Sequence, residues 1–345
     1  MVWPRIQKIK INNLRCDITW LQHIRRTLNA NGIAGKISFE NIINEQNTIN
    51  REELVSVLTK HKYNVRTELI SFYKQKFYED LRTTIDNETI IPINKDVKDV
   101  MLGLLTPPLD FLCEELNKAL TKWPIDEQTL IDTLCTLDRQ DLRDLLDRYH
   151  ILYGNSLEED ISSKNEAYLM TFLLLKVKNA AKDAASLTLQ DAKTLAETLY
   201  NAGEGVHTTD EDVFINILGN SDFAHIKYIA EEYRKLSKPW KKSGRSLRQA
   251  VLDEFSQGLK KALVAVLDSA ENPATYFAQA LHNALQGPGT DDAALKRIIV
   301  HRSETDLDKI KKEYVKLYSR TLAEDVEADT SGEYTTILLA IINRS

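Results

Sequence analysis

Apolar residues recur along the chain with the spacing of amphipathic helices. Three such faces follow one another near the C-terminus: Leu295, Ile298 and Ile299; Leu307, Ile310, Tyr314 and Leu317; and Tyr334, Ile337, Leu338 and Ile341. Each set recurs at intervals of three or four residues, which places its members on one side of a helix. No segment alternates apolar and polar residues with a period of two over a useful length. The pattern therefore predicts an all-α protein.

The same pattern occurs four times. The common origins are Ile49, Ile125, Thr209 and Thr290. An apolar residue follows five positions later, at Leu54, Leu130, Phe214 and Leu295, and a tyrosine 24 positions later, at Tyr73, Tyr149, Tyr233 and Tyr314. A leucine stands 32 positions after the origin in three copies, at Leu81, Leu157 and Leu322, whereas the third copy has Leu247, six residues later. We infer a fourfold helical repeat of roughly 75 residues with an insertion in its third copy.

Polar residues at the predicted helix starts indicate how the helices are capped. Thr290 is expected to cap the N-terminus of the helix that follows it, with Asp291 and Asp292 placed to favour the helix dipole. Ser303 and Asp306 have the spacing of a capping box before the next helix.

Composition narrows the classes of function. The chain has 345 residues, 43% hydrophobic and 28% charged, as in ordinary soluble globular proteins. A net charge of −6 gives no basic surface for nucleic acid, and binding to an acidic membrane would need divalent ions as a bridge. Cys16, Cys113 and Cys135 lack metal-ligand spacing and predict reduced thiols in a cytosolic protein. We expect neither a signal peptide nor a transmembrane helix.

One motif near the C-terminus points to calcium. The loop Leu285–Thr290 contains Gly287 and Gly289, and Asp329 follows Gly289 by forty residues. Two glycines let a loop turn its carbonyl oxygens toward one point, and a distant carboxylate supplies the charge. Ca²⁺ accepts six to eight such hard oxygen ligands at flexible angles. A Gly-Pro-Gly turn alone would indicate only a helix connection, but the carboxylate and the surrounding repeat favour a calcium site.

This motif, with Arg302-Ser303-Glu304 and Asp329-Thr330-Ser331-Gly332, resembles the annexin family over residues from about 17 to the end. The resemblance implies a curved disc of four repeats, each with five helices, whose convex face carries calcium loops toward the membrane. In the fourth repeat it implies the carbonyls of Leu285, Gly287 and Gly289 as ligands, with Asp329 as a bidentate carboxylate. Water or a lipid phosphoryl oxygen would complete the coordination.

The expected organisation is a head at 1–16 and repeats at 17–107, 108–180, 181–270 and 271–345. Compared with the family, the first repeat holds an insertion at about 29–47. The third holds a basic insertion at about 237–243, within the segment Lys235–Arg245, whose five basic residues surround Trp240. This basic segment would serve either as a site for an acidic partner or as a solvated loop.

The other repeats preserve the calcium motif less well. In the third, the resemblance implies the carbonyls of Gly203, Val206 and Thr208 with the Glu254 carboxylate, although Thr208 stands where the family prefers glycine. A β-branched residue would strain that position if it needs a positive φ. In the first, Gln46 and Thr48 take the glycine positions and the loop at 87–95 is longer, so no calcium is assigned there.

The second repeat has lost the motif. Its loop reads Lys122-Trp123-Pro124-Ile125, and Lys164 takes the place of the acidic ligand. The change is either simple decay of the site or a gain of fixed positive charge that contacts lipid phosphate without metal. In the second case Trp123 would enter the headgroup region, although it can equally pack against its own helices.

These observations favour calcium-dependent binding to anionic phospholipid membranes, with Ca²⁺ as the cofactor and self-association on the membrane as a compensation for few sites. The alternative is a membrane or cytoskeletal scaffold that binds proteins through the head, the insertions and repeats one and two. Seven scattered histidines and the lack of a nucleophile motif argue against an enzyme. We expect a cytoplasmic protein, peripheral on membranes when calcium rises, and secretion by an unconventional route stays open.

Overall fold

The computed structural model describes residues 50–87, 94–164, 167–182, 188–203, 209–236, 245–287 and 289–344. Helices and short connections make up all of these residues, which contain no β-strand. The chain divides into a unit at 1–54, described only from residue 50 onward, and a compact unit at 55–345. Every contact below belongs to the second unit. None of the described helices combines the length and the apolar character needed to cross a bilayer.

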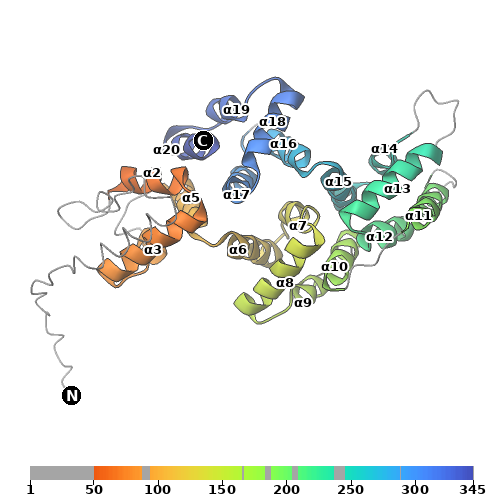
Figure 1. The fold of residues 1–345 in the computed structure, drawn as a ribbon, viewed down its shortest axis with the longest axis horizontal. Helices are drawn as coiled ribbons and strands as arrows, with labels where there is room; N and C mark the ends of the chain where they lie inside the picture. The colour runs from red at the N-terminus through yellow and green to blue at the C-terminus, as the bar shows by residue number, and fades with distance from the viewer. Residues whose placement is uncertain are drawn as a thin grey trace, which may run out of the picture. The chain divides into compact units, whose positions relative to one another are not determined.

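The helices follow the sequence repeat (Figure 1). The first copy contains α2 (Arg51–Lys60), α3 (Tyr63–Phe77), α4 (Leu81–Asp86) and α5 (Lys95–Leu105). The second contains α6 (Pro108–Thr121), α7 (Glu127–Leu134), α8 (Arg139–Tyr153), α9 (Leu157–Ser162) and α10 (Tyr168–Ala181). The third contains α11 (Leu189–Ala202), α12 (Glu211–Gly219), α13 (Phe223–Leu236), α14 (Leu247–Glu254) and α15 (Gln257–Glu271). The fourth contains α16 (Pro273–Ala284), α17 (Asp292–Ser303), α18 (Leu307–Tyr318), α19 (Leu322–Asp329) and α20 (Gly332–Ile342).

The repeated leucine marks the same structural position in every copy. It is the first residue of α4, α9, α14 and α19, and it is almost fully buried in each. The polar residue before it caps the helix in all four copies, at Asp80, Ser156, Ser246 and Thr321. The alignment of Leu247 with the other leucines, across six inserted residues, is thereby confirmed.

The repeated tyrosine is also buried in all four copies, and in three of them its hydroxyl contacts the short helix that follows. Tyr149 donates to Asp160 at 2.8 Å, and Tyr314 donates to Asp325 at 2.6 Å. In the first copy the Tyr73 hydroxyl donates to that of Thr84 at 3.3 Å. The partner stands eleven residues after the tyrosine in these three copies, so the tyrosine fixes the short helix against the long one before it.

Two of the expected helix caps are wrong. The cap of α17 is Asp291, whose carboxylate accepts from the backbone N–H of Ala294, and Thr290 lies outside the helix. The capping box expected from Ser303 and Asp306 does not form. Ser303 is the last residue of α17, and Asp306, at the N-cap of α18, makes no capping hydrogen bond because Arg302 holds its carboxylate at 2.7 and 2.6 Å. In both places a tertiary or ion-pair partner holds a side chain for which spacing predicted a local role.

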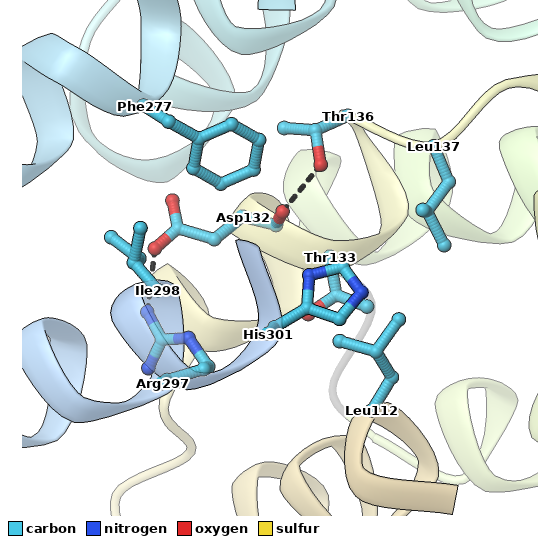
Figure 2. Close-up of a pocket in the computed structure, with 9 residues that line it drawn as sticks. All are labelled: Leu112, Asp132, Thr133, Thr136, Leu137, Phe277, Arg297, Ile298 and His301. Atoms are coloured by element: carbon cyan, nitrogen blue, oxygen red, sulfur yellow. Dashed lines mark hydrogen bonds and ion pairs between the residues drawn. The ribbon is translucent and has the colours of Figure 1, made fainter. Parts of the chain in front are cut away.

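A buried ion pair joins the second and fourth copies (Figure 2). Arg297 of α17 donates to the Asp132 carboxylate of α7 at 2.5 Å and to the Thr129 hydroxyl at 2.6 Å. The other Asp132 oxygen accepts from the Tyr276 hydroxyl of α16 at 2.5 Å. Asp132 and Arg297 are each about 5% exposed, so this network lies in the packed interior between the copies.

Candidate calcium and membrane site

The loop between α16 and α17 has the backbone shape that the motif predicts. Gly287 and Gly289 have φ values of 111° and 102°, which side-chain-bearing residues rarely adopt. A Cβ atom at either position would meet nothing within 4 Å, so the dihedral angle alone requires glycine. Both glycines are exposed, whereas Leu285 at the end of α16 is buried. Pro288 lies outside the described residues.

A single backbone hydrogen bond closes this loop. The Asp291 N–H donates to the Ala284 carbonyl at 2.8 Å. The second and third copies contain equivalent bonds, from Asp126 to Ala119 at 3.2 Å and from Asp210 to Ala202 at 2.9 Å. The three loops are therefore closed by the same backbone hydrogen bond and differ in the residues that it encloses.

Asp329 lies beside the fourth-repeat loop. It is the last residue of α19, and the Thr290 hydroxyl lies 2.7 Å from its Oδ2 and 3.0 Å from its backbone oxygen. This contact connects residues 39 apart in sequence and ties the carboxylate to the end of the glycine loop. The structure thus brings the predicted acidic residue to the predicted loop, by a hydroxyl to which sequence reasoning had given another role.

The residues present fit a calcium ion. Gly287 and Gly289 are exposed and have positive φ values, which let a loop turn its carbonyl oxygens toward one point, and one carboxylate is held next to them. These are hard oxygen donors with room for further ligands from outside the protein. The described residues contain no cluster of three or more His, Cys, Asp or Glu side chains that could hold a metal, but a site made mainly of carbonyls does not require one.

In the third repeat, Thr209 and Glu254 reproduce the contact between Thr290 and Asp329. The Thr209 hydroxyl donates to the Glu254 carboxylate at 3.0 Å. Gly203, by contrast, has a φ of −110° and is buried, and a Cβ there would lie 3.3 Å from the Phe214 ring. This glycine is explained by close packing rather than by a positive φ. Val206 and Thr208, the other expected carbonyl donors, lie outside the described residues.

In the second repeat, the loop presents a tryptophan to solvent. Trp123 is 86% exposed, which contradicts the alternative that it packs against its own helices. Lys122 is exposed beside it, and Lys164, seven residues after the first leucine of α9, stands where Asp329 stands in the fourth repeat. In the first repeat, the insertion, Gln46, Thr48 and most of the loop at 87–95 lie outside the described residues.

The family model for annexin matches residues 111–175, 194–266 and 276–341. Annexin B10 of Drosophila melanogaster is 34% identical over 294 residues, which cover 84% of this chain and 88% of the relative. Human annexin A8 is 32% identical over 298 residues, covering 85% and 87%. The chain belongs to the annexin family.

Solved annexin structures agree with this assignment. Annexin III superposes with a TM-score of 0.78 at 30% identity, covering 88% of this chain and 90% of that one. Chicken annexin V superposes with a TM-score of 0.77 at 26% identity, covering 88% and 94%. The predicted fold class, all-α with annexin-type repeats of five helices, is confirmed.

The annexin signature at Arg302-Ser303-Glu304 has a structural role. Arg302 pairs with Asp306 and lies over the Phe277 ring, 4.3 Å from its centroid. Glu304 accepts a hydrogen bond from Arg66 at 2.9 Å, and Arg66 is 1% exposed. These charges are neutralised within the protein, as expected for structural pairs.

A small cavity lies between α7 and α17, and it has no room for a ligand (Figure 2). Its volume of about 10 Å³ is enough for a single water molecule. His301 lines it, and burial is the main cause that lowers the pKa of this histidine to about 3. The imidazole is therefore neutral near pH 7, and the side chain is partly buried.

Sequence reasoning missed two residues that contact the predicted acidic ligands. The spacing predicts a helix cap at Thr290, but Thr209 stands at the same repeat position, and this shared threonine indicates a shared contact. Arg245 belongs to the basic segment around Trp240, but it contacts Asp253 and Glu254. Its place directly before the cap of the short helix, like Arg320 in the fourth repeat, was the available signal.

Proposed function

We propose that this protein binds anionic phospholipid surfaces in a calcium-dependent manner, with the ion held between the fourth-repeat loop and a lipid phosphate. Annexins are in general calcium-dependent phospholipid-binding proteins. The observation that carries the proposal is the Asp329 carboxylate tied by Thr290 to a loop with two positive-φ glycines. The ligands are the carbonyls of Leu285, Gly287 and Gly289 with the Asp329 side chain.

Calcium and membrane strengthen each other's binding in this arrangement. A site of neutral carbonyls and one carboxylate holds Ca²⁺ weakly by itself, on the order of 10⁻⁴ M or poorer. A lipid phosphate supplies the missing charge and ligands, so each partner raises the affinity for the other. A third-repeat site at Gly203, Val206, Thr208 and Glu254 would add to the first through effective concentration.

Sedimentation with phosphatidylserine vesicles across a calcium titration tests the proposal. The wild type should sediment only with calcium, and Asp329→Ala should raise the calcium needed for half-maximal binding at least tenfold or abolish binding. Glu327→Ala is the matched control, because it removes the same charge from an exposed position on the same helix. Wild-type protein that stays in solution at every calcium concentration would refute the proposal.

We also propose that the second-repeat loop contacts the same lipid surface without metal. The exposed Trp123 fits the headgroup region, where tryptophan side chains are favoured. Lys122 and Lys164 add positive charge, and neither ammonium group makes an ion pair with another residue in the described part of the chain. A basic residue near an anionic surface contributes about 1 kcal/mol.

Lys164→Glu and Trp123→Ala test this contact. Each should weaken vesicle binding about threefold to tenfold at a fixed, intermediate calcium concentration, because about 1 kcal/mol corresponds to a factor of five. Any residual binding in calcium-free buffer should fall with them. If both variants bind like the wild type with and without calcium, the loop is only a decayed calcium site.

Self-association on the membrane and protein partners that bind the head or the insertions stay predictions. Analytical ultracentrifugation with and without calcium-loaded lipid nanodiscs measures the first. The insertions at about 29–47 and 237–243 fall in segments that lie wholly or largely outside the described residues, so the scaffold alternative rests on the sequence alone.

A further inference from the structure

The acidic residue of the third repeat has a counter-charge inside the protein. Glu254 and Asp329 are the last residues of α14 and α19, and each accepts a hydrogen bond from the threonine at the origin of its repeat. Arg245 also reaches Glu254, at 3.3 Å, and pairs with Asp253 at 2.7 Å. Within the described residues, no lysine or arginine forms such a pair with Asp329.

An arginine occupies the same position in the fourth repeat but has a different partner. Arg320 directly precedes the cap of α19, as Arg245 directly precedes the cap of α14. The Arg320 guanidinium pairs with Asp325 at 2.9 Å, and Asp325 is 8% exposed. Asp325 lies four residues before Asp329 on α19, and it is the carboxylate with which the Arg320 guanidinium pairs.

The third repeat lacks the residue that would hold its arginine in that way. Asp325 is the fourth residue of α19, and the fourth residue of α14 is Ala250. The fourth residues of α9 and α4 are Asp160 and Thr84, so only the third copy has no polar side chain here. With no carboxylate at position 250, the Arg245 guanidinium pairs instead with the two acids at the end of the helix.

Arg245 and a calcium ion would compete for the same carboxylate. A cation that binds Glu254 must either displace the guanidinium or approach a like charge within a few ångströms, and both reduce its affinity. Arg245 is 18% exposed and Glu254 32% exposed, so solvent screens the pair and the effect is moderate.

We propose that Arg245 lowers the calcium affinity of the third repeat by pairing with Glu254. Alanine at position 250 favours this pair, because it removes the carboxylate that holds the equivalent Arg320 in the fourth repeat. The inference rests on the proposed function, and it adds a residue that determines how strongly the third repeat binds calcium relative to the fourth. The arginine before the short helix thus pairs with a structural carboxylate, Asp325, in the fourth repeat. In the third repeat it pairs with Glu254, the proposed calcium ligand.

Two substitutions in an Asp329→Ala background test the inference by different routes. Arg245→Gln removes the counter-charge, and Ala250→Asp restores the carboxylate that should draw Arg245 away. Both should lower the calcium needed for half-maximal binding to phosphatidylserine vesicles by about twofold to fivefold, the range for a partly exposed ion pair. Arg320→Gln in the same background is the matched control and should change nothing.

Calorimetric titration of the same variants with calcium alone provides a readout that does not depend on lipid. A calcium requirement unchanged by Arg245→Gln in both measurements overturns the inference, while calcium-dependent binding by the wild type would leave the proposed function standing. A wild type that binds no vesicles refutes the proposed function instead. Ala250→Asp adds a carboxylate at a buried position, so Arg245→Gln decides the question if that variant does not fold.

Discussion

The position of a metal ligand can depend on one hydroxyl group outside the ligand set. Thr290 donates to Asp329 and thereby holds the carboxylate beside the glycine loop. Partners that orient ligands in this way commonly change metal affinity by one or two orders of magnitude when they are removed. The threonine and the carboxylate act together, although only the carboxylate belongs to the motif.

Thr290→Val should raise the calcium needed for half-maximal vesicle binding about tenfold, because valine keeps the shape and loses the donor. The measurement is a calcium titration of vesicle sedimentation. Thr336→Val is the control, since the Thr336 hydroxyl donates only within α20, to the Gly332 carbonyl. A lower calcium requirement in Thr290→Val would mean that the hydroxyl competes with the ion rather than orienting its ligand.

Among the helices, α19 carries Asp329, the proposed acidic ligand, and is short. It has eight residues, with Asp329 at its last position, so the ends of the helix determine where the carboxylate lies. A capping box fixes its start: Thr321 accepts from the Glu324 N–H, and the Glu324 carboxylate accepts from the Thr321 N–H at 2.7 Å. The hydrogen bonds from the Thr321 backbone and side chain lower the pKa of Glu324 from its usual 4.5.

Glu324→Gln should lower the melting temperature by about 1–3 °C at pH 7, where the carboxylate is charged. Since the folded pKa lies below the unfolded value, the contribution is fully present above about pH 4.5 and is lost as the pH falls through the folded pKa. Thermal denaturation from pH 7 to pH 3 should therefore show the two proteins converging in acid. Glu327→Gln, on the same helix, should show no such trend, and a pH-independent difference for Glu324→Gln would contradict the assignment.

At the scale of the whole second unit, buried charge connects copies of the repeat that are distant in sequence. Asp132 and Arg297 are 165 residues apart and lie in α7 and α17. The Asp132 carboxylate also accepts from Tyr276 and Gln128, so its loss would leave several buried donors without an acceptor. The pair therefore contributes to the packing between the second and fourth copies, and neither residue is one of the proposed calcium ligands.

Asp132→Ala should destabilise the protein by about 3–5 kcal/mol, because it leaves the Arg297 guanidinium buried and unpaired. Urea denaturation measures the change. The double variant Asp132→Leu/Arg297→Met should lose less than Asp132→Ala alone, since no uncompensated charge remains. Equal losses in the single and double variants would show that the ion pair itself contributes little. The calcium requirement of the folded variants should match that of the wild type.

The sequence by itself determined the helical class and the fourfold repeat, and it predicts which fourth-repeat residues would bind calcium. Helical spacing and a tyrosine at a fixed offset are local or periodic signals, and they survive the insertion that displaces Leu247. A glycine loop and a distant acid are also readable, because calcium chemistry restricts which residues can serve.

Only the tertiary structure decided which side chains share a partner. Spacing made Thr290 a helix cap and Arg245 part of a basic loop, whereas the fold directs the first to Asp329 and the second to Glu254. Polar side chains have several partners within reach, and the energies of the alternatives are similar. The choice is made by helices that pack next to each other, and the position of those helices is not a property of any local sequence.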